Sequence, residues 1–106
     1  MPKYLVQGSY SNQGLSGLLK EGGSKRQHAA EEAVKGLGGR LEAFYYAFGN
    51  DDFVIILDVP SNVDATALSL AANATGAVKS RMTVLITPEE VDQATKRTVN
   101  FRAPGK

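Results

Sequence analysis

Apolar and polar residues fall into short runs along the chain, separated by glycine, proline and asparagine. Residues 3–10 are rich in apolar and aromatic types and predict a first strand. The leucines at positions 15, 18 and 19 have helical spacing, which predicts a short helix that ends at Gly22-Gly23. The chain is therefore expected to begin with a strand and a short helix.

A longer helix is predicted from Ser24 onward. Ser24 and Gln27 have the spacing of a capping box, in which each side chain bonds a backbone N–H at the open end of the helix. Behind them, a narrow apolar stripe at helical spacing is formed by Ala30, Ala33, Val34 and Leu37. We expect Gly38-Gly39 to end this helix.

The middle of the chain predicts a hairpin followed by a helix. Residues 40–48 and 53–59 are both rich in apolar and aromatic types, and the link 49–52 consists of turn formers. Pro60 breaks the second of these strands. After it, one face of a helix is predicted at Val63, Ala67, Leu70, Ala71 and Ala74, with Gly76 as a left-handed cap.

The last third of the chain predicts a strand, a helix and a tail. Residues 77–86 have strand character. Thr87-Pro88-Glu89-Glu90 has the pattern of a capping box with proline at the first helical position, so a final helix is expected to run to near Lys96. We divide the chain into a domain of residues 1–96 and a basic tail of residues 97–106.

This order of elements predicts an α+β fold. It is the ferredoxin-like βαββαβ order, with an antiparallel four-stranded sheet and an extra C-terminal helix. The alternative is an open α/β domain with a parallel sheet, which needs a helix between all strands. The short link at residues 49–52 argues against that alternative.

The sheet of such a fold has helices on one face only, and the residues predicted for its other face are apolar. In residues 53–59 both alternating sets are apolar. In residues 40–48, Leu41, Ala43, Tyr45 and Ala47 alternate with Phe44, Tyr46 and Phe48. If about five such side chains stayed exposed to water, the fold would lose about 1.5–3 kcal/mol of hydrophobic stabilisation for each of them. We therefore expect a homodimer or higher homo-oligomer. The alternative is a tolerated apolar patch.

Two further segments favour an oligomer. Residues 65–78 contain no charged side chain, and Leu68 points away from the stripe predicted for that helix. The tail carries Val99 and Phe101 among polar and basic residues. We expect the tail to pack across a partner subunit.

Composition and charge narrow the function classes. The 106 residues include 12 basic and 11 acidic ones, a net charge of +1, so no single-sign field favours a nucleic-acid partner. The chain has no cysteine, which excludes disulfides, a thiolate nucleophile and cysteine zinc sites. No apolar run reaches the roughly 18 residues of a membrane span and no signal-peptide pattern is present, so we expect no membrane partner and a cytoplasmic location.

Five segments together resemble the small bacterial GYD-domain family: Tyr4–Tyr10, Gly22–Ser24, Leu37–Leu41, Phe48–Phe53 and Val84–Val91. The resemblance covers residues 4–94 and implies a ferredoxin-like domain of the dimeric α/β-barrel type, in a family whose biochemical role is largely uncharacterised. Gly49 and Asp52 match the family's naming motif, whereas Asp51 stands where tyrosine is usual. Relatives with similar barrels include heme-free monooxygenases, isomerases and binding proteins, so the fold alone does not choose a function.

Two groups are candidates for acid–base chemistry. His28 is the only histidine, and helical spacing places it opposite the apolar stripe, one turn from Glu32. The pair suggests an acid–base group or half of a metal site, but it supplies only two ligands, so we interpret it as a solvated polar face and expect no metal or cofactor. Asp51 and Asp52 suggest a shared proton or a cation site, with two turn residues as the alternative.

Two other groups are candidates for ligand binding. Ser24 and Arg26 lie at a predicted helix N-terminus, where backbone N–H groups and a cation suit a carboxylate or phosphate; a plain corner between helices is the alternative. Tyr10, Tyr46 and Arg81 lie on predicted strands and are candidates to line a cavity between sheet and helices. Packing in the core or an interface explains the tyrosines equally well.

These observations lead to three hypotheses about function. The first is an oligomeric small-molecule-binding or accessory domain with a cavity between sheet and helices. The second is a cofactor-free monooxygenase or isomerase for a small organic acid or aromatic compound, with a tyrosine, His28 or Asp52 handling protons. The third is a structural assembly unit. A deep pocket that contains His28 or Asp52 favours the enzyme, and a filled interior favours assembly.

Overall fold

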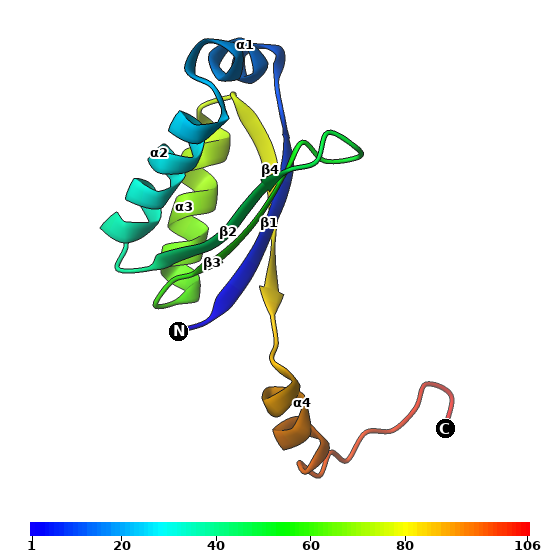
Figure 1. Cartoon of the computed structure of the whole chain (residues 1–106). Coiled ribbons are helices and arrows are strands. Elements are labelled where there is room, and N and C mark those ends of the chain that lie inside the picture. Colours follow the sequence, from blue (N-terminus) through cyan, green and yellow to red (C-terminus); the bar gives the residue numbers. More distant parts are fainter.

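A four-stranded antiparallel sheet with helices on one face forms the body of the protein. The computed structural model describes residues 1–106 (Figure 1). The strands are β1 (Lys3–Tyr10), β2 (Arg40–Tyr46), β3 (Phe53–Asp58) and β4 (Val78–Leu85), and the helices are α1 (Asn12–Glu21), α2 (Gly23–Gly36), α3 (Asn62–Ala74) and α4 (Pro88–Thr95). The sheet order is β2-β3-β1-β4, all pairs antiparallel. This confirms the predicted α+β, ferredoxin-like arrangement.

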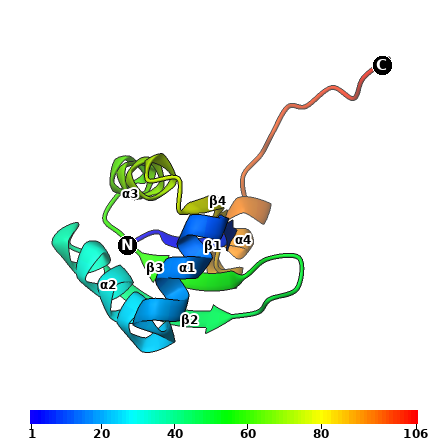
Figure 2. The same cartoon turned by 90° about the horizontal axis from the view of Figure 1, so that it is seen from above.

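Helices α2 and α3 lie on the same face of the sheet in both views (Figure 2). Helix α2 packs along β2 and α3 packs along β4, at opposite edges of the sheet. The core lies between this covered face and the helices, and consists of Tyr4, Val6, Val34, Phe53, Leu57, Val59 and Ala65. The opposite face of the sheet carries no helix and is called the open face below.

The predicted helix ends are confirmed except at the start of α2. Glu90 N–H donates to Thr87 Oγ1 and Thr87 N–H donates to Glu90 Oε1, so the capping box of α4 is present. Gly76 follows α3 in the left-handed region, with φ of 76°. However, α2 begins at Gly23 and no side chain caps it. The capping box predicted for Ser24 and Gln27 is absent because both residues already lie inside the helix.

Helix α3 turns a different face to the sheet from the one predicted. The predicted inward residues Val63 and Leu70 are 78% and 67% exposed, whereas Ala65 is buried and Leu68 packs against the core. Asn73 fixes this rotation because its Oδ1 accepts from Ser80 N–H at 2.7 Å. Both faces of α3 are apolar, so its hydrophobic period could not choose between them.

Strand β2 contains a register shift that the alternating pattern did not predict. The pairing with β3 shifts between Leu41 and Ala43. One extra residue reverses the alternation, so Leu41 lies on the covered face with Phe44. The predicted grouping of Leu41 with Ala43 on one face is therefore wrong. The strand also ends at Tyr46, before Phe48, which has a left-handed φ of 51°.

The C-terminal segment leaves the body of the protein. Residues 86–106, called the arm below, continue from β4 past the end of the sheet, and all of them are exposed (Figure 1). The radius of gyration is 17.0 Å, whereas a compact domain of this length would have about 13 Å. Exposed apolar side chains on the arm include Val91, Val99 and Phe101. None of the helices is both long and apolar enough to span a membrane.

Candidate ligand cavity between the sheet and the helices

A cavity of about 190 Å³ lies between α2, α3 and the covered face of the sheet. It exists because the helix faces over it carry small side chains: Ala29, Ala30 and Ala33 come from α2 and Ala72 from α3. The body of the wall is apolar and consists of Val6, Val34, Leu41, Phe44, Phe53, Ile55, Leu57, Leu68, Val78 and Met82. Larger side chains at the alanine positions would fill this space.

Four polar side chains complete the wall: Tyr10, Arg26, Ser69 and Ser80. Tyr10 is the last residue of β1 and pairs with Val78, while Gly8 pairs with Ser80, so Tyr10 and Ser80 lie at the same end of the sheet. Arg26 comes from the first turn of α2, and Ser69 lies one turn before the end of α3. These elements bring the polar groups together at one end of the cavity.

Burial shapes the chemistry of the Tyr10 hydroxyl. The ring packs on Phe53 with a centroid distance of 5.3 Å. Burial, followed by the neighbouring Tyr46 hydroxyl, raises the pKa of Tyr10 to about 12, with Arg26 acting in the opposite direction. Tyr10 is therefore a protonated phenol at neutral pH, and its O–H is a hydrogen-bond donor.

Arg26 is the only charged residue on the cavity wall. Its one ion-pair partner is Glu21, with Nη1 and Oε2 3.5 Å apart and both side chains more than 40% exposed. An exposed pair at this distance holds the guanidinium weakly. Of the two residues proposed for an anion site, Arg26 thus reaches the cavity, whereas Ser24 is exposed and lies off its wall.

Tyr46 lies beside the cavity and holds the start of α2. Its hydroxyl donates to the Gly23 carbonyl at 3.1 Å, and its ring stacks on Phe48. The first residue of α2, Gly23, packs closely against this ring, and a Cβ atom at this position would lie only 3.0 Å from it. Tyr46 therefore fixes the helix end from which Arg26 projects, without lining the wall itself.

Arg81 does not line the cavity, contrary to the sequence-based expectation. Its neighbours Ser80 and Met82 face the cavity, so alternation places Arg81 on the open face. There its Nη1 and Nη2 bind the two carboxylate oxygens of Asp51, each at 2.9 Å. The hydrogen bonds from Arg81 lower the pKa of Asp51.

The two acid–base candidates also lie off the cavity wall. Asp52 Oδ2 accepts from the Tyr10 N–H at 2.9 Å, so this carboxylate ties the turn to the end of β1. Asp51 and Asp52 have different partners, which argues against a shared proton. His28 is 73% exposed at its side chain and has Glu32 Oε1 3.9 Å from Nε2. No group of three or more histidine, aspartate or glutamate side chains is placed to hold a metal ion.

A family model described as the GYD domain matches residues 4–95. The chain belongs to the GYD-domain family. The match runs from β1 to the end of α4, as the sequence resemblance predicted. Comparison with curated proteins gave no match. In this GYD domain the naming segment Gly49–Asp52 is the β2–β3 link, and its two aspartates bind Arg81 and the end of β1.

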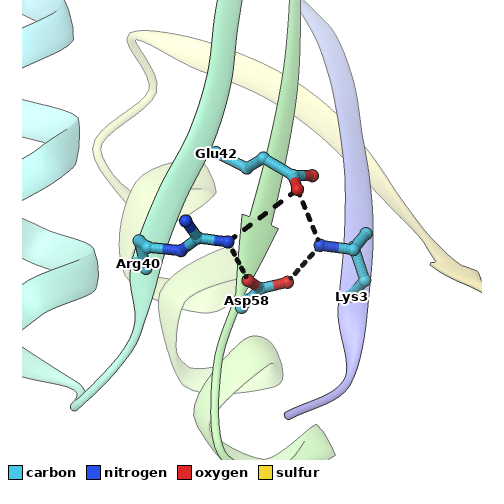
Figure 3. A network of polar contacts seen from close by, with 4 residues as sticks. All are labelled: Lys3, Arg40, Glu42 and Asp58. Atoms are coloured by element: carbon cyan, nitrogen blue, oxygen red, sulfur yellow. Dashed lines mark hydrogen bonds and ion pairs between the residues drawn. The ribbon is translucent and has the colours of Figure 1, made fainter.

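Sequence reasoning missed two features of this GYD domain. The first is the pair of cavity hydroxyls, Ser69 and Ser80, for which the only signal was two serines in otherwise apolar segments. The second is an ion network at one end of the open face (Figure 3). It joins three strands through Lys3, Arg40, Glu42 and Asp58.

Asp58 is the most buried member of this network. It is buried, its Oδ1 lies 2.8 Å from Lys3 Nζ and its Oδ2 lies 3.2 Å from Arg40 Nη2. The hydrogen bonds from Lys3 and then Arg40 lower the pKa of Asp58. The network binds the edge strand β2 and the central strand β1 to β3, and its groups face away from the cavity.

Proposed function

We propose that this GYD-domain protein is a small-molecule-binding domain whose ligand occupies the cavity between the sheet and the helices. The observation that carries the proposal is an apolar cavity of about 190 Å³ with its few polar groups at one end. An engineered apolar cavity of ~150 Å³ admits benzene. Ligand sites are typically apolar pockets with a few placed polar groups.

Binding is favoured over the two other hypotheses. An enzyme of the proposed kind needs a proton-handling group beside its substrate. His28 and Asp52 lie off the wall, and Tyr10, with its pKa raised to about 12, is a donor rather than a base at neutral pH. A structural assembly unit is expected to have a filled interior, so the cavity also argues against that role.

We also propose that the protein works as a homo-oligomer in which a second copy covers the open face. The middle of that face is apolar: Leu5, Val54 and Ile56 are only partly buried, and Tyr45 is 70% exposed. The arm of the same chain extends away from its own body (Figure 1), and its Val99 and Phe101 are both more than 70% exposed. A contiguous exposed apolar patch typically marks a surface that another molecule covers.

Native mass spectrometry of the protein purified from its own host tests both parts. We expect a dimer or larger oligomer that carries extra mass from a retained small organic molecule. A monomer at micromolar concentration would contradict the assembly. An oligomer that carries no extra mass, and that also binds no small aromatic compound in solution, would contradict the binding function.

Removing the arm tests its place in the assembly. A chain that ends at Ile86 keeps the whole sheet and all core residues. We expect the truncated chain to stay folded and to lose oligomer size or stability, because its apolar arm residues no longer cover a partner. An unchanged oligomer would show that the arm is free of the interface.

A further inference from the structure

The cavity is divided into a polar end and an apolar end. Tyr10, Arg26, Ser69 and Ser80 lie where β1 ends and α2 begins. The opposite end is walled by Val34, Leu41 and Leu57, the last of which pairs with Tyr4 near the start of β1. A ligand that fits both ends must therefore have an apolar body and one polar group.

Every polar group on the wall is able to donate a hydrogen bond. Arg26 only donates, and the Tyr10 hydroxyl stays protonated at neutral pH. The Ser80 and Ser69 hydroxyl oxygens accept from Asn73 Nδ2, at 3.0 and 3.4 Å, which leaves their own hydrogens for another acceptor. No aspartate or glutamate lines the cavity. A wall of donors with one cation selects an anionic acceptor.

We propose that the cavity takes a compact aromatic carboxylate, whose ring lies among the apolar side chains and whose carboxylate binds Arg26 and the Tyr10 hydroxyl. This inference rests on the proposed function, since it names the ligand of the same cavity. The volume of about 190 Å³ exceeds the ~150 Å³ that holds benzene, which leaves room for one carboxylate on the ring. The planar guanidinium of Arg26 matches a carboxylate with two parallel hydrogen bonds.

Three probes of the same shape and different charge test the ligand class. Benzoate is an anion, benzamide is neutral and benzamidinium is a cation, and their binding is measured by titration calorimetry on the full chain. We expect benzoate to bind about 10-fold or more tightly than benzamidinium, with benzamide between them. Arg26→Gln should weaken benzoate about 10-fold and change benzamide little.

Matched variants locate the effect. Lys25 is the neighbouring cation, is exposed and lies off the wall, so Lys25→Gln should leave benzoate binding unchanged. Ala72→Leu extends a side chain into the cavity and should abolish binding of all three probes while the protein stays folded by circular dichroism.

The outcomes separate the ligand class from the binding function. If the three probes bind equally and Arg26→Gln changes none of them, the carboxylate proposal falls and the cavity remains a binding site. If Lys25→Gln weakens benzoate binding as much as Arg26→Gln does, the preference for the anion comes from the overall electrostatic field of the protein. In that case the carboxylate proposal is also wrong. If no probe binds and toluene does not bind either, both the ligand class and the proposed function fail.

Discussion

The two faces of the sheet use the same four strands in different ways. On the covered face, Tyr4, Phe53 and Leu57 are each less than 5% exposed beneath α2 and α3. On the open face, Leu5, Val54 and Ile56 remain only partly buried, and an ion network holds one end of the strands. The covered face and its helices line a cavity, while the open face is a surface without helices.

The comparison shows that each face leaves apolar groups without full packing, for a different reason on each side. The helices supply a stable core, yet their alanine-rich inner faces leave space that a ligand can fill. The open face has no helix, and we propose that a second copy of the chain covers its apolar centre. In the proposed function, one face binds a small molecule and the other binds a second copy of the chain.

The largest expected effect comes from truncating one leucine on each face. Leu57→Ala removes a side chain that is 2% exposed in the core and should lower the free energy of unfolding by about 2–5 kcal/mol. Leu5→Ala, on the open face, should cost less at low protein concentration, and its cost should rise with concentration as the oligomer forms. Urea unfolding at two protein concentrations measures both. If the two variants lose the same free energy of unfolding, and this loss does not depend on protein concentration, the proposed difference between the faces is contradicted.

The next effect concerns the polar anchor of α3. Asn73 accepts from Ser80 N–H and donates to the Ser80 hydroxyl. Asn73→Ala leaves these groups of β4 without partners and should lower stability by about 1–3 kcal/mol. The matched control is Asn50→Ala in the exposed β2–β3 link, which should change stability little. A similar melting temperature for the two variants would show that Asn73 does not hold the helix.

The ion network on the open face predicts a pH-dependent contribution. Lys3 and Arg40 lower the folded-state pKa of Asp58 below its ordinary value of 3.8. The Asp58 carboxylate therefore stabilises the fold above pH 3.8, and this contribution is lost as the pH falls through the lower folded-state pKa. Asp58→Asn should lower the melting temperature at pH 7, and the difference from the parent should shrink as the pH falls below 3.8.

The control for this prediction is Asp92→Asn on the exposed arm, which should have little effect at either pH. Melting curves followed by circular dichroism give the comparison. A difference between Asp58→Asn and the parent that stays constant across this pH range would show that the network does not act through the charge of Asp58.

The smallest expected effect lies at the other end of the open face. Arg81 and Asp51 form a bidentate ion pair at the protein surface. Arg81→Gln should lower the melting temperature slightly in low salt and not measurably in high salt, because salt screens exposed charges. It should leave benzoate binding unchanged, since Arg81 faces away from the cavity. A loss of benzoate binding would place Arg81 at the ligand site. It would contradict the assignment of the ligand to the covered face alone.

Much of the fold could be predicted from the sequence because its signals are local. The turn formers at residues 49–52, the capping box at Thr87 and the glycine after α3 each fix one element end by the conformation of a few residues. The rotation of α3 and the register of β2 could not be predicted in this way. The first depends on Asn73 meeting Ser80, and the second on one extra residue between Leu41 and Ala43.

The candidate site was predicted only in part for the same reason. Tyr10 and Arg26 were identified by residue type and by position at an element end, and both lie on the cavity wall. Ser69 and Ser80 were missed because a lone serine in an apolar segment has no distinctive spacing. Arg81 was assigned to the cavity because strand character alone does not tell which face a residue takes; that requires the register of β4 against β1.

Nuclear Overhauser contacts between toluene and the methyl groups of the protein test the central account most directly. Toluene carries no charge, so the result does not depend on the carboxylate proposal. We expect contacts from the toluene ring to the methyl groups of Val34, Leu57 and Leu68 on the cavity wall, and none to Leu5, Val54 or Ile56. Contacts confined to the open face, or no contacts at all, would contradict a ligand site between the sheet and the helices.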